Sequence, residues 1–232
     1  MVEITGRDFN HISNVLRLQS GDKIIVNDNH GLDYTVCLQN FSKSSVIGEI
    51  IKKEVNKNEP GVNITLAQAI PKKRNIELVI EKCTEIGIKE IIPLQTKRTV
   101  VKLSAKKKEK RIKRWQKIAR AAAKQSERGI IPQVKNLHSI SQLSALKQEY
   151  DLMLVCWTGE KEKDLKQIML EFKGKAENIL LVVGPEGGLT VQEVDRLDGV
   201  NLTLGSRILR TETAGLVALT MILYELDEMG GK

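Results

Sequence analysis

Two uninterrupted apolar runs in the second half of the chain place the strongest constraint on its fold. Residues 151–157 read DLMLVCW, and residues 178–184 read NILLVVG. Strands that are buried on both faces of a parallel sheet have this pattern, whereas half-buried strands alternate apolar and polar residues. Because parallel strands are joined by crossovers that usually contain a helix, the two runs predict an α/β domain with a mostly parallel sheet.

The residues around these runs alternate between strand and helix patterns. Further strands are predicted from short apolar segments, at residues 63–70, 88–95 and 201–205. Helices are predicted from helical spacing of apolar residues, at residues 73–86, 105–126 and 211–228. Gly87 is expected to end the first of these helices, and Glu212 lies in the first turn of the last. Thr190 and Glu193 form a capping box that begins another helix. We therefore assign residues 63–232 to one α/β domain.

The first part of the chain has a different pattern, and we predict a small β-barrel domain over residues 1–60. Its strand-like runs are separated by turn residues, at residues 22–28, 32–40 and 44–55. Asp8 is expected to cap a short helix whose apolar positions are Ile12, Val15 and Leu16. The stretch NKNEPGVN, residues 56–63, is the predicted linker to the α/β domain.

The net charge of +8 is concentrated in one segment. Residues 97–128 contain 14 Lys or Arg against only two glutamates, so this segment carries +12 and the rest of the chain is slightly acidic. Such a basic stripe favours a polyanionic partner, since each phosphate it neutralises releases counterions. A solvated helix face is the alternative interpretation. Aromatic residues make up only 3% of the chain, which argues against a protein that stacks unpaired bases on rows of Phe and Tyr.

The composition also indicates the compartment. Cys37, Cys83 and Cys156 are scattered through apolar runs without a CxxC pair, which is typical of reduced thiols inside a cell. The first residues lack an apolar signal core, and no run approaches the roughly 20 residues of a membrane helix. We expect a soluble, cytoplasmic protein that does not bind a membrane. The three histidines have no metal-ligand spacing, so no metal is expected.

Two loops that follow predicted strands carry the candidate chemistry. Residues 184–189, GPEGGL, lie where open α/β sheets bind ligands, and their glycines allow a close approach to the backbone. They match neither the Walker A loop nor the GxGxxG pattern. Residues 204–214, LGSRILRTETA, combine two arginines, an apolar pair and a helix N-terminus, which could enclose a nucleoside and an acidic group. Taken separately, each loop could equally be a turn without a ligand.

Together these segments resemble a known family of enzymes. The pair LVVGPEGGLT and LTLGSRILRTETAG resembles the SPOUT class of RNA methyltransferases, and within it the 16S rRNA uridine-N3 methyltransferase family. The segments HISNVLRL, KKRNIELVIEKCTEIGI and QSERGIIPQV are also similar to that family, so the resemblance covers the whole chain. It implies an N-terminal PUA-like β-barrel, a C-terminal trefoil-knotted sheet, S-adenosylmethionine as cofactor, a homodimer, and 16S rRNA within the 30S subunit as substrate.

The resemblance implies the residues that bind the cofactor, and the chemistry of the reaction suggests the catalytic and RNA-binding residues. The cofactor-binding set comes from the two loops and the end of one strand: Trp157, Gly184, Glu186, Gly187, Gly188, Leu204, Gly205, Ile208, Leu209, Arg210, Thr213 and Ala214. Arg210 is the candidate catalytic residue, because a cation favours the deprotonated uracil by stabilising charge on its carbonyl oxygens. The candidate RNA-binding cations are His11, Arg17, Lys72, Lys73, Arg74, Arg98 and Arg128, with the basic residues of 106–117.

Three other interpretations remain open at this point. A non-catalytic RNA-binding or ribosome-assembly factor would use the same basic stripe but would not bind S-adenosylmethionine. A SPOUT enzyme with a different RNA target, such as a ribose 2′-hydroxyl, would differ in the position of the methyl group on its product. A nucleotide hydrolase is disfavoured, since no Lys-Ser/Thr follows GPEGG. The apolar residues Leu216, Leu219 and Ile222 suit a dimer interface or ordinary core packing equally well.

Overall fold

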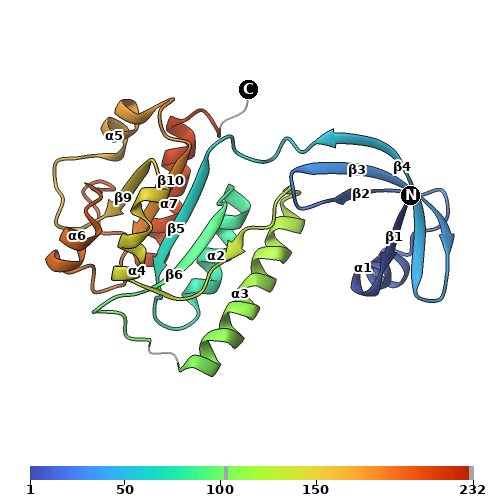
Figure 1. The fold of residues 1–232 in the computed structure, drawn as a ribbon, viewed down its shortest axis with the longest axis horizontal. Coiled ribbons are helices and arrows are strands. Elements are labelled where there is room, and N and C mark those ends of the chain that lie inside the picture. Colours follow the sequence, from blue (N-terminus) through green and yellow to red (C-terminus); the bar gives the residue numbers. More distant parts are fainter. Residues whose placement is uncertain (102–103, 230–232) are drawn as a thin grey trace. The chain divides into compact units, whose positions relative to one another are not determined.

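The computed structural model describes residues 1–101 and 104–229, and the chain divides into two compact units (Figure 1). The first unit contains residues 1–59 together with 128–130. The second contains residues 60–127 and 131–232. Among the described residues, no helix is both long and apolar enough to cross a membrane.

The first unit is built on a four-stranded antiparallel sheet. In space its strands follow the order β1 (Val2–Thr5), β4 (Ser45–Val55), β3 (Leu32–Phe41) and β2 (Lys23–Asn27). Strands β2, β3 and β4 confirm the three predicted runs, whereas β1 was not predicted. The core of this unit is mostly aliphatic, with Phe9 and Ile12 packed on Val36, Leu38 and Val46 of the sheet. The predicted small β-domain is therefore confirmed, as a half-barrel whose edge strands are β1 and β2.

The short helix of this unit differs from the prediction. Helix α1 (Gly6–Asn10) starts after Thr5, so Asp8 lies in its first turn and is not the N-cap. The chain then continues as a π-helical turn, His11–Val15. Ile12 is buried as expected, but Val15 and Leu16 are 66% and 51% exposed. The helix ends directly after the π-helical turn, and Leu18 packs on the core in place of Val15 and Leu16.

The second unit contains the predicted parallel sheet. Its order in space is β11-β9-β10-β5-β6-β7, and every pair is parallel. The bounds of the strands are β5 (Asn63–Ala69), β6 (Glu90–Gln95), β7 (Gln133–Val134), β9 (Leu152–Cys156), β10 (Asn178–Val183) and β11 (Val200–Leu202), with β8 (His138–Ser139) beside β6. The two apolar runs form β9 and β10, in the middle of the sheet, where both faces are covered.

Helices cover both faces of this sheet. One face packs against α2 (Asn75–Ile86), α3 (Ala105–Gln125), α5 (Leu165–Phe172) and α7 (Thr211–Glu225). The opposite face packs against α4 (Ile140–Ala145) and α6 (Val191–Leu197), and a 3-10 turn, Lys147–Glu149, follows α4. Helices α4 and α5 were not predicted. The capping box of Thr190 and Glu193 at the start of α6 is confirmed, as is the end of α2 at Gly87, whose φ is 120°.

The last helix decides between the two interpretations of its apolar residues. Leu219 and Ile222 have no exposed surface and belong to the core of the second unit, so they are not available to a partner chain. Leu216 is half-buried against the same core.

The connection from β11 to α7 places the candidate site. Strand β11 pairs with β9, whereas α7 packs beside β10 and β5, so residues 203–210 run across the carboxyl ends of the strands. The trefoil knot that the resemblance implies stays a prediction.

Candidate active site

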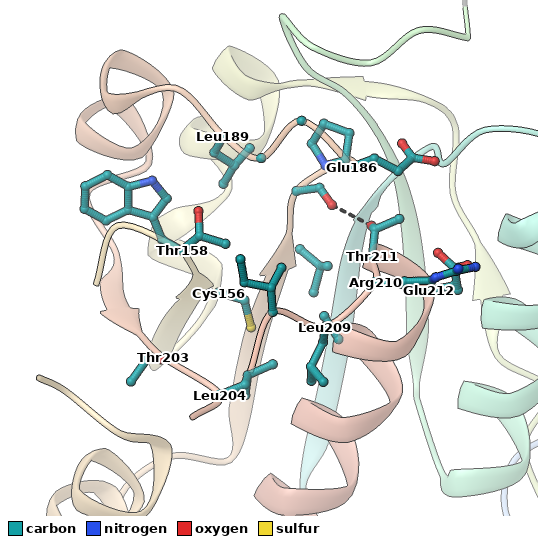
Figure 2. Close-up of a pocket in the computed structure, with 18 of the residues that line it drawn as sticks. Cys156, Thr158, Glu186, Leu189, Thr203, Leu204, Leu209, Arg210, Thr211 and Glu212 are labelled. Carbon is teal, nitrogen blue, oxygen red and sulfur yellow. Dashed lines mark hydrogen bonds between the residues drawn. The ribbon is translucent and has the colours of Figure 1, made fainter. Parts of the chain in front are cut away.

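A pocket of about 670 Å³ lies at the carboxyl ends of β9, β10 and β11. It brings together three segments that are far apart in the sequence: residues 156–158, residues 183–189 and residues 202–212. The lining also includes Lys72 and Lys73, which precede α2, and Asn75, its first residue, together with Lys161 and Ala214. Figure 2 shows Glu186 and Leu189 on one side of this pocket, with Leu204 and Leu209 on the opposite side. The two predicted loops thus form its opposing walls.

The first wall is the loop 184–189 after β10, and its glycines have distinct structural roles. A Cβ at Gly184 would come within 3.0 Å of Cγ and 3.1 Å of the backbone nitrogen of Leu189, so no larger residue fits without displacing the loop. Gly188 has φ +70°, in the left-handed region that favours glycine, and its N–H donates to the Pro185 carbonyl at 2.8 Å. The loop is therefore a tight turn with its backbone close to the pocket.

The second wall is the connection 204–210. Gly205 has φ +100° and is exposed, and Leu204 and Leu209 are half-buried and supply apolar surface to the pocket. Ile208 lies at the rim, where it is 88% exposed. An apolar pocket wall is thus provided by Leu204 and Leu209 rather than by the predicted pair of Ile208 and Leu209.

The end of β9 contributes a third side. The Trp157 N–H donates to the Leu202 carbonyl at 3.1 Å, which attaches this segment to β11. Its indole ring lies directly against Gly159, where a larger residue would collide with it. Burial raises the pKa of the Cys156 thiol to about 12, which favours the protonated form near neutral pH.

Two carboxylates of the pocket accept hydrogen bonds from residues 72–75, which lead into α2. The backbone N–H of Lys72 donates to Oε1 of Glu186 at 2.7 Å, and Nδ2 of Asn75 donates to Oε1 of Glu212 at 2.8 Å. Glu186 belongs to the first wall and Glu212 to the first turn of α7, directly after the second wall, so residues 72–75 are bonded on both sides of the pocket.

Arg210 lies at the pocket, immediately before α7, and its side chain is exposed. It is the N-cap residue of that helix, and its carbonyl accepts the N–H groups of Thr213 and Ala214 at 2.9 and 2.8 Å. Ala214 lines the pocket, whereas Thr213 does not. Because α7 begins at this edge of the pocket, the positive end of its helix dipole adds to the charge of the guanidinium there.

The predicted RNA-binding cations are divided between the two units. His11 and Arg17 belong to the first unit, where Arg17 has φ 55°. Lys72 and Lys73 line the pocket, and Arg74 is the N-cap residue of α2. The exposed Arg98 donates from its guanidinium to the Gly187 carbonyl at 2.6 Å, so it also supports the first wall.

Arg128 is a correction to this set. Its guanidinium donates to Glu59 at 2.6 Å and its side chain is only 3% exposed. A buried ion pair of this kind leaves no cation to present to a phosphate, and Arg128 instead joins residues 128–130 to the first unit.

Sequence reasoning missed several pocket residues. Cys156, Thr158, Asn75 and Thr211 all line the pocket. Their positions next to the predicted segments were visible, but only Thr211 carried a specific signal, since it begins the helix that follows the LGSRILR loop. Within residues 1–101 and 104–229, no group of three metal-ligating side chains is found.

Comparison with known proteins agrees with this architecture. Residues 4–51 match the RNA methyltransferase PUA domain, and residues 57–223 match the RNA methyltransferase domain. The chain is 40% identical to ribosomal RNA small subunit methyltransferase E of Bacillus subtilis over 234 residues, which cover 98% of this chain and 91% of that protein.

Solved structures of relatives supply the cofactor. Ribosomal RNA small subunit methyltransferase E of Neisseria gonorrhoeae, bound to S-adenosylmethionine, is 29% identical with a TM-score of 0.79, over 96% of this chain and 91% of that one. A Legionella pneumophila methyltransferase with the same bound cofactor is 27% identical with a TM-score of 0.82, over 96% and 91%. The predicted family, enzyme class and cofactor are confirmed: the chain belongs to the ribosomal RNA small subunit methyltransferase E family of S-adenosylmethionine-dependent enzymes.

Proposed function

We propose that this enzyme transfers the methyl group of S-adenosylmethionine to N3 of a uridine in 16S rRNA, and that the 670 Å³ pocket holds the cofactor. The observation that carries the proposal is the convergence of both glycine-containing loops on one pocket, in a chain 40% identical to a small-subunit rRNA methyltransferase. A non-catalytic assembly factor would have no use for this pocket.

The residues of the pocket suit the cofactor. Leu204 and Leu209 offer apolar surface for an adenine, and the backbone of residues 184–189 offers hydrogen-bonding groups close to the cavity. When bound, S-adenosylmethionine supplies an electrophilic methyl group on a sulfonium, and in-line transfer depends chiefly on alignment of the reactants. We assign cofactor binding to the predicted residues that line the pocket: Trp157, Gly184, Glu186, Gly187, Gly188, Leu204, Gly205, Ile208, Leu209, Arg210 and Ala214.

Arg210 is the proposed catalytic residue. Uridine N3 becomes a good nucleophile only when its proton has left, and a neighbouring cation stabilises the resulting anion. The Arg210 guanidinium and the N-terminus of α7 lie together at the edge of the pocket, so both favour negative charge on the base. Glu212 accepts a hydrogen bond from Asn75, so we assign this carboxylate to holding the start of α7 against the start of α2.

The rRNA is held by cations outside the cofactor loops. We propose His11, Arg17, Lys72, Lys73, Arg74 and Arg98 for this role, with the exposed basic residues of α3. If these groups contact phosphates, the logarithm of the RNA-binding constant should fall with the logarithm of the salt concentration, with a slope of about −0.7 to −0.9 per phosphate contact. A response that does not depend on salt would contradict the assignment.

The enzyme is proposed to work as a homodimer in the cytoplasm. Thr213, Val217, Thr220 and Tyr224 are spaced along α7 at helical intervals, and each is exposed or only half-buried. Tyr224 is 64% exposed, which makes this stripe of α7 a candidate contact between protomers. Light scattering after size-exclusion chromatography should give twice the 26.0 kDa mass of the chain, and Tyr224→Glu should reduce it.

The decisive experiment uses methyl-labelled S-adenosylmethionine and 30S subunits from a strain that lacks the gene, followed by nucleoside analysis of the rRNA. Label in 3-methyluridine is the expected result. Label in a 2′-O-methylated nucleoside would keep the enzyme class and overturn the proposed target atom. Cofactor binding without label would overturn the assembled subunit as substrate, and free 16S rRNA is then the next substrate to assay. Absence of both label and cofactor binding would favour the assembly factor.

A further inference from the structure

A polar side chain outside both loops is buried at the end of strand β5. Gln68 has no exposed surface, and the residues on either side of it along the strand, Ala67 and Ala69, are buried and apolar. A glutamine is unexpected in a strand that is covered on both faces, because its amide must find partners for its N–H groups and for its oxygen. Its presence therefore requires an explanation in terms of the groups it contacts.

The hydrogen bonds of Gln68 have a defined direction. Nε2 of Gln68 donates to the Ala69 carbonyl at 3.1 Å and to Oγ1 of Thr211 at 2.9 Å. The Thr211 hydroxyl uses its single proton to donate to the Gly184 carbonyl at 2.6 Å, the bond drawn in Figure 2. Thr211 must therefore accept from Gln68. The amide cannot be reversed, since the Ala69 carbonyl only accepts.

The amide oxygen of Gln68 loses a hydrogen bond in this position, so burying the glutamine here is unfavourable by itself. Within the described part of the chain, Oε1 of Gln68 is buried without a hydrogen-bond partner. It lies next to Gly215, one turn after Thr211, where a Cβ would come within 3.0 Å of it. An apolar residue at position 68 would avoid the loss of this hydrogen bond. Gln68 donates a hydrogen bond to Thr211, which an apolar residue could not do.

Through Thr211, that bond connects the start of the first wall to the residue that follows the second wall. Gly184 begins the loop 184–189, and Thr211 is the first residue of α7, directly after Arg210. We propose that Gln68 is a positioning residue, which acts through Thr211 to hold the Gly184 carbonyl and the start of α7 at a fixed separation. Gln68 does not line the pocket, so its effect on the ligand is indirect. The inference rests on the proposed function of this pocket as the S-adenosylmethionine site.

The test changes one hydrogen-bonding group at a time and measures the dissociation constant of S-adenosylmethionine by calorimetry. Gln68→Leu removes the amide at similar volume, and Thr211→Val removes the hydroxyl at nearly constant shape. Each should weaken cofactor binding about tenfold, because buried partners lose their hydrogen bonds. Thr211→Ser keeps the hydroxyl and should bind within about threefold of the unaltered protein. The double variant should bind about as weakly as either single variant, since both break the same chain of bonds.

A matched control separates positioning from general stability. Thr84 is also fully buried in the second unit, and its hydroxyl donates to the Ile80 carbonyl within α2 at 2.6 Å. Thr84→Val should lower the Tm while the cofactor dissociation constant stays unchanged. Thr211 itself lines the pocket, so its variants also change a group that faces the cofactor, whereas Gln68 variants do not. Should Gln68→Leu fail to fold, Gln68→Met carries the test, since it keeps the length of the side chain without its hydrogen-bonding groups.

The outcomes distinguish this inference from the proposed function. If unaltered protein binds S-adenosylmethionine and Thr211→Val binds it equally well with only a lower Tm, the bond chain is merely structural and the inference is overturned. If unaltered protein does not bind S-adenosylmethionine, the proposed function fails, and the inference fails with it.

Discussion

The two walls of the pocket differ in how firmly the rest of the protein holds them. The loop 184–189 is bonded from three sides, by Thr211 at Gly184, Lys72 at Glu186 and Arg98 at Gly187. In the second wall, the Arg210 carbonyl is bonded to α7, but residues 204–209 have, in the part of the chain that the structure describes, one hydrogen bond, from the Thr203 hydroxyl to the Gly205 carbonyl at 3.3 Å. One wall is therefore preformed, and the other is free to adjust.

This difference suggests a division of labour. A preformed wall lowers the entropy cost of ligand binding. This property suits the loop 184–189, which would bind the cofactor whether or not the RNA is present. The second wall ends at Arg210, the proposed catalytic residue, and can change its conformation when the uridine binds. Substitutions in the two walls should accordingly have different kinetic signatures.

The largest effect is expected at the end of the exposed wall. Arg210→Ala should lower kcat by about 10²- to 10³-fold, as is typical when a donor to developing negative charge is removed. The dissociation constant of S-adenosylmethionine and the Tm should change little, because the Arg210 side chain is exposed. Single-turnover methyl transfer measures the first quantity and calorimetry the second. Near-normal turnover would remove Arg210 from the mechanism.

A pair of glycines tests the contrast between the walls directly. Gly188 and Gly205 both have positive φ, +70° and +100°, and a Cβ at either position would have enough space. Alanine in such a conformation costs about 1–3 kcal/mol unless the backbone can relax. Gly188→Ala, in the firmly bonded loop, should therefore weaken cofactor binding more than Gly205→Ala, although φ +100° is intrinsically the less favourable angle. The reverse order of dissociation constants would contradict the proposed difference in rigidity.

Arg98 should affect the cofactor as well as the RNA. Arg98→Ala removes the bond to the Gly187 carbonyl and should weaken S-adenosylmethionine binding about fivefold, the equivalent of one ordinary hydrogen bond. Arg98→Lys should preserve much of the salt dependence of RNA binding, because the charge remains. If Arg98→Ala changes only RNA affinity, the guanidinium does not support the first wall.

The smallest expected effect concerns acid stability. Burial of Glu193 alone would raise its pKa, but hydrogen bonds from the Lys97 N–H and from Thr190 outweigh it, so the pKa is lowered overall. A carboxylate with a lowered pKa contributes stability that is present above its unfolded-state pKa, about 4.3, and is lost as the pH falls through its folded-state pKa. Glu193→Gln should therefore be less stable than the unaltered protein at neutral pH. The difference in Tm between Glu193→Gln and the unaltered protein should become smaller below about pH 4. A difference that does not change with pH would contradict this account.

The short-range features of this protein were predictable from the sequence because they depend on neighbouring residues. The two apolar runs, the glycine that ends α2 and the capping box of Thr190 are each specified within a few positions. One prediction that was wrong also depended on the spacing of neighbouring residues. The helix over Ile12, Val15 and Leu16 was predicted from α-helical spacing, whereas His11–Val15 forms a π-helical turn, so the exposure of Val15 and Leu16 was missed.

Tertiary structure alone decided which polar groups meet. Gln68 and Thr211 are separated by 143 positions, and Arg128 and Glu59 by 69, and no pattern in the chain pairs them. The sequence by itself determined the alternating elements, the two loops and, through its resemblance, the family. The first wall is held by several hydrogen bonds and the second wall by few. This difference depends on where the connection 203–210 crosses the sheet. That path is set by the packing of α7 against β10 and β5, which local residue spacing does not encode.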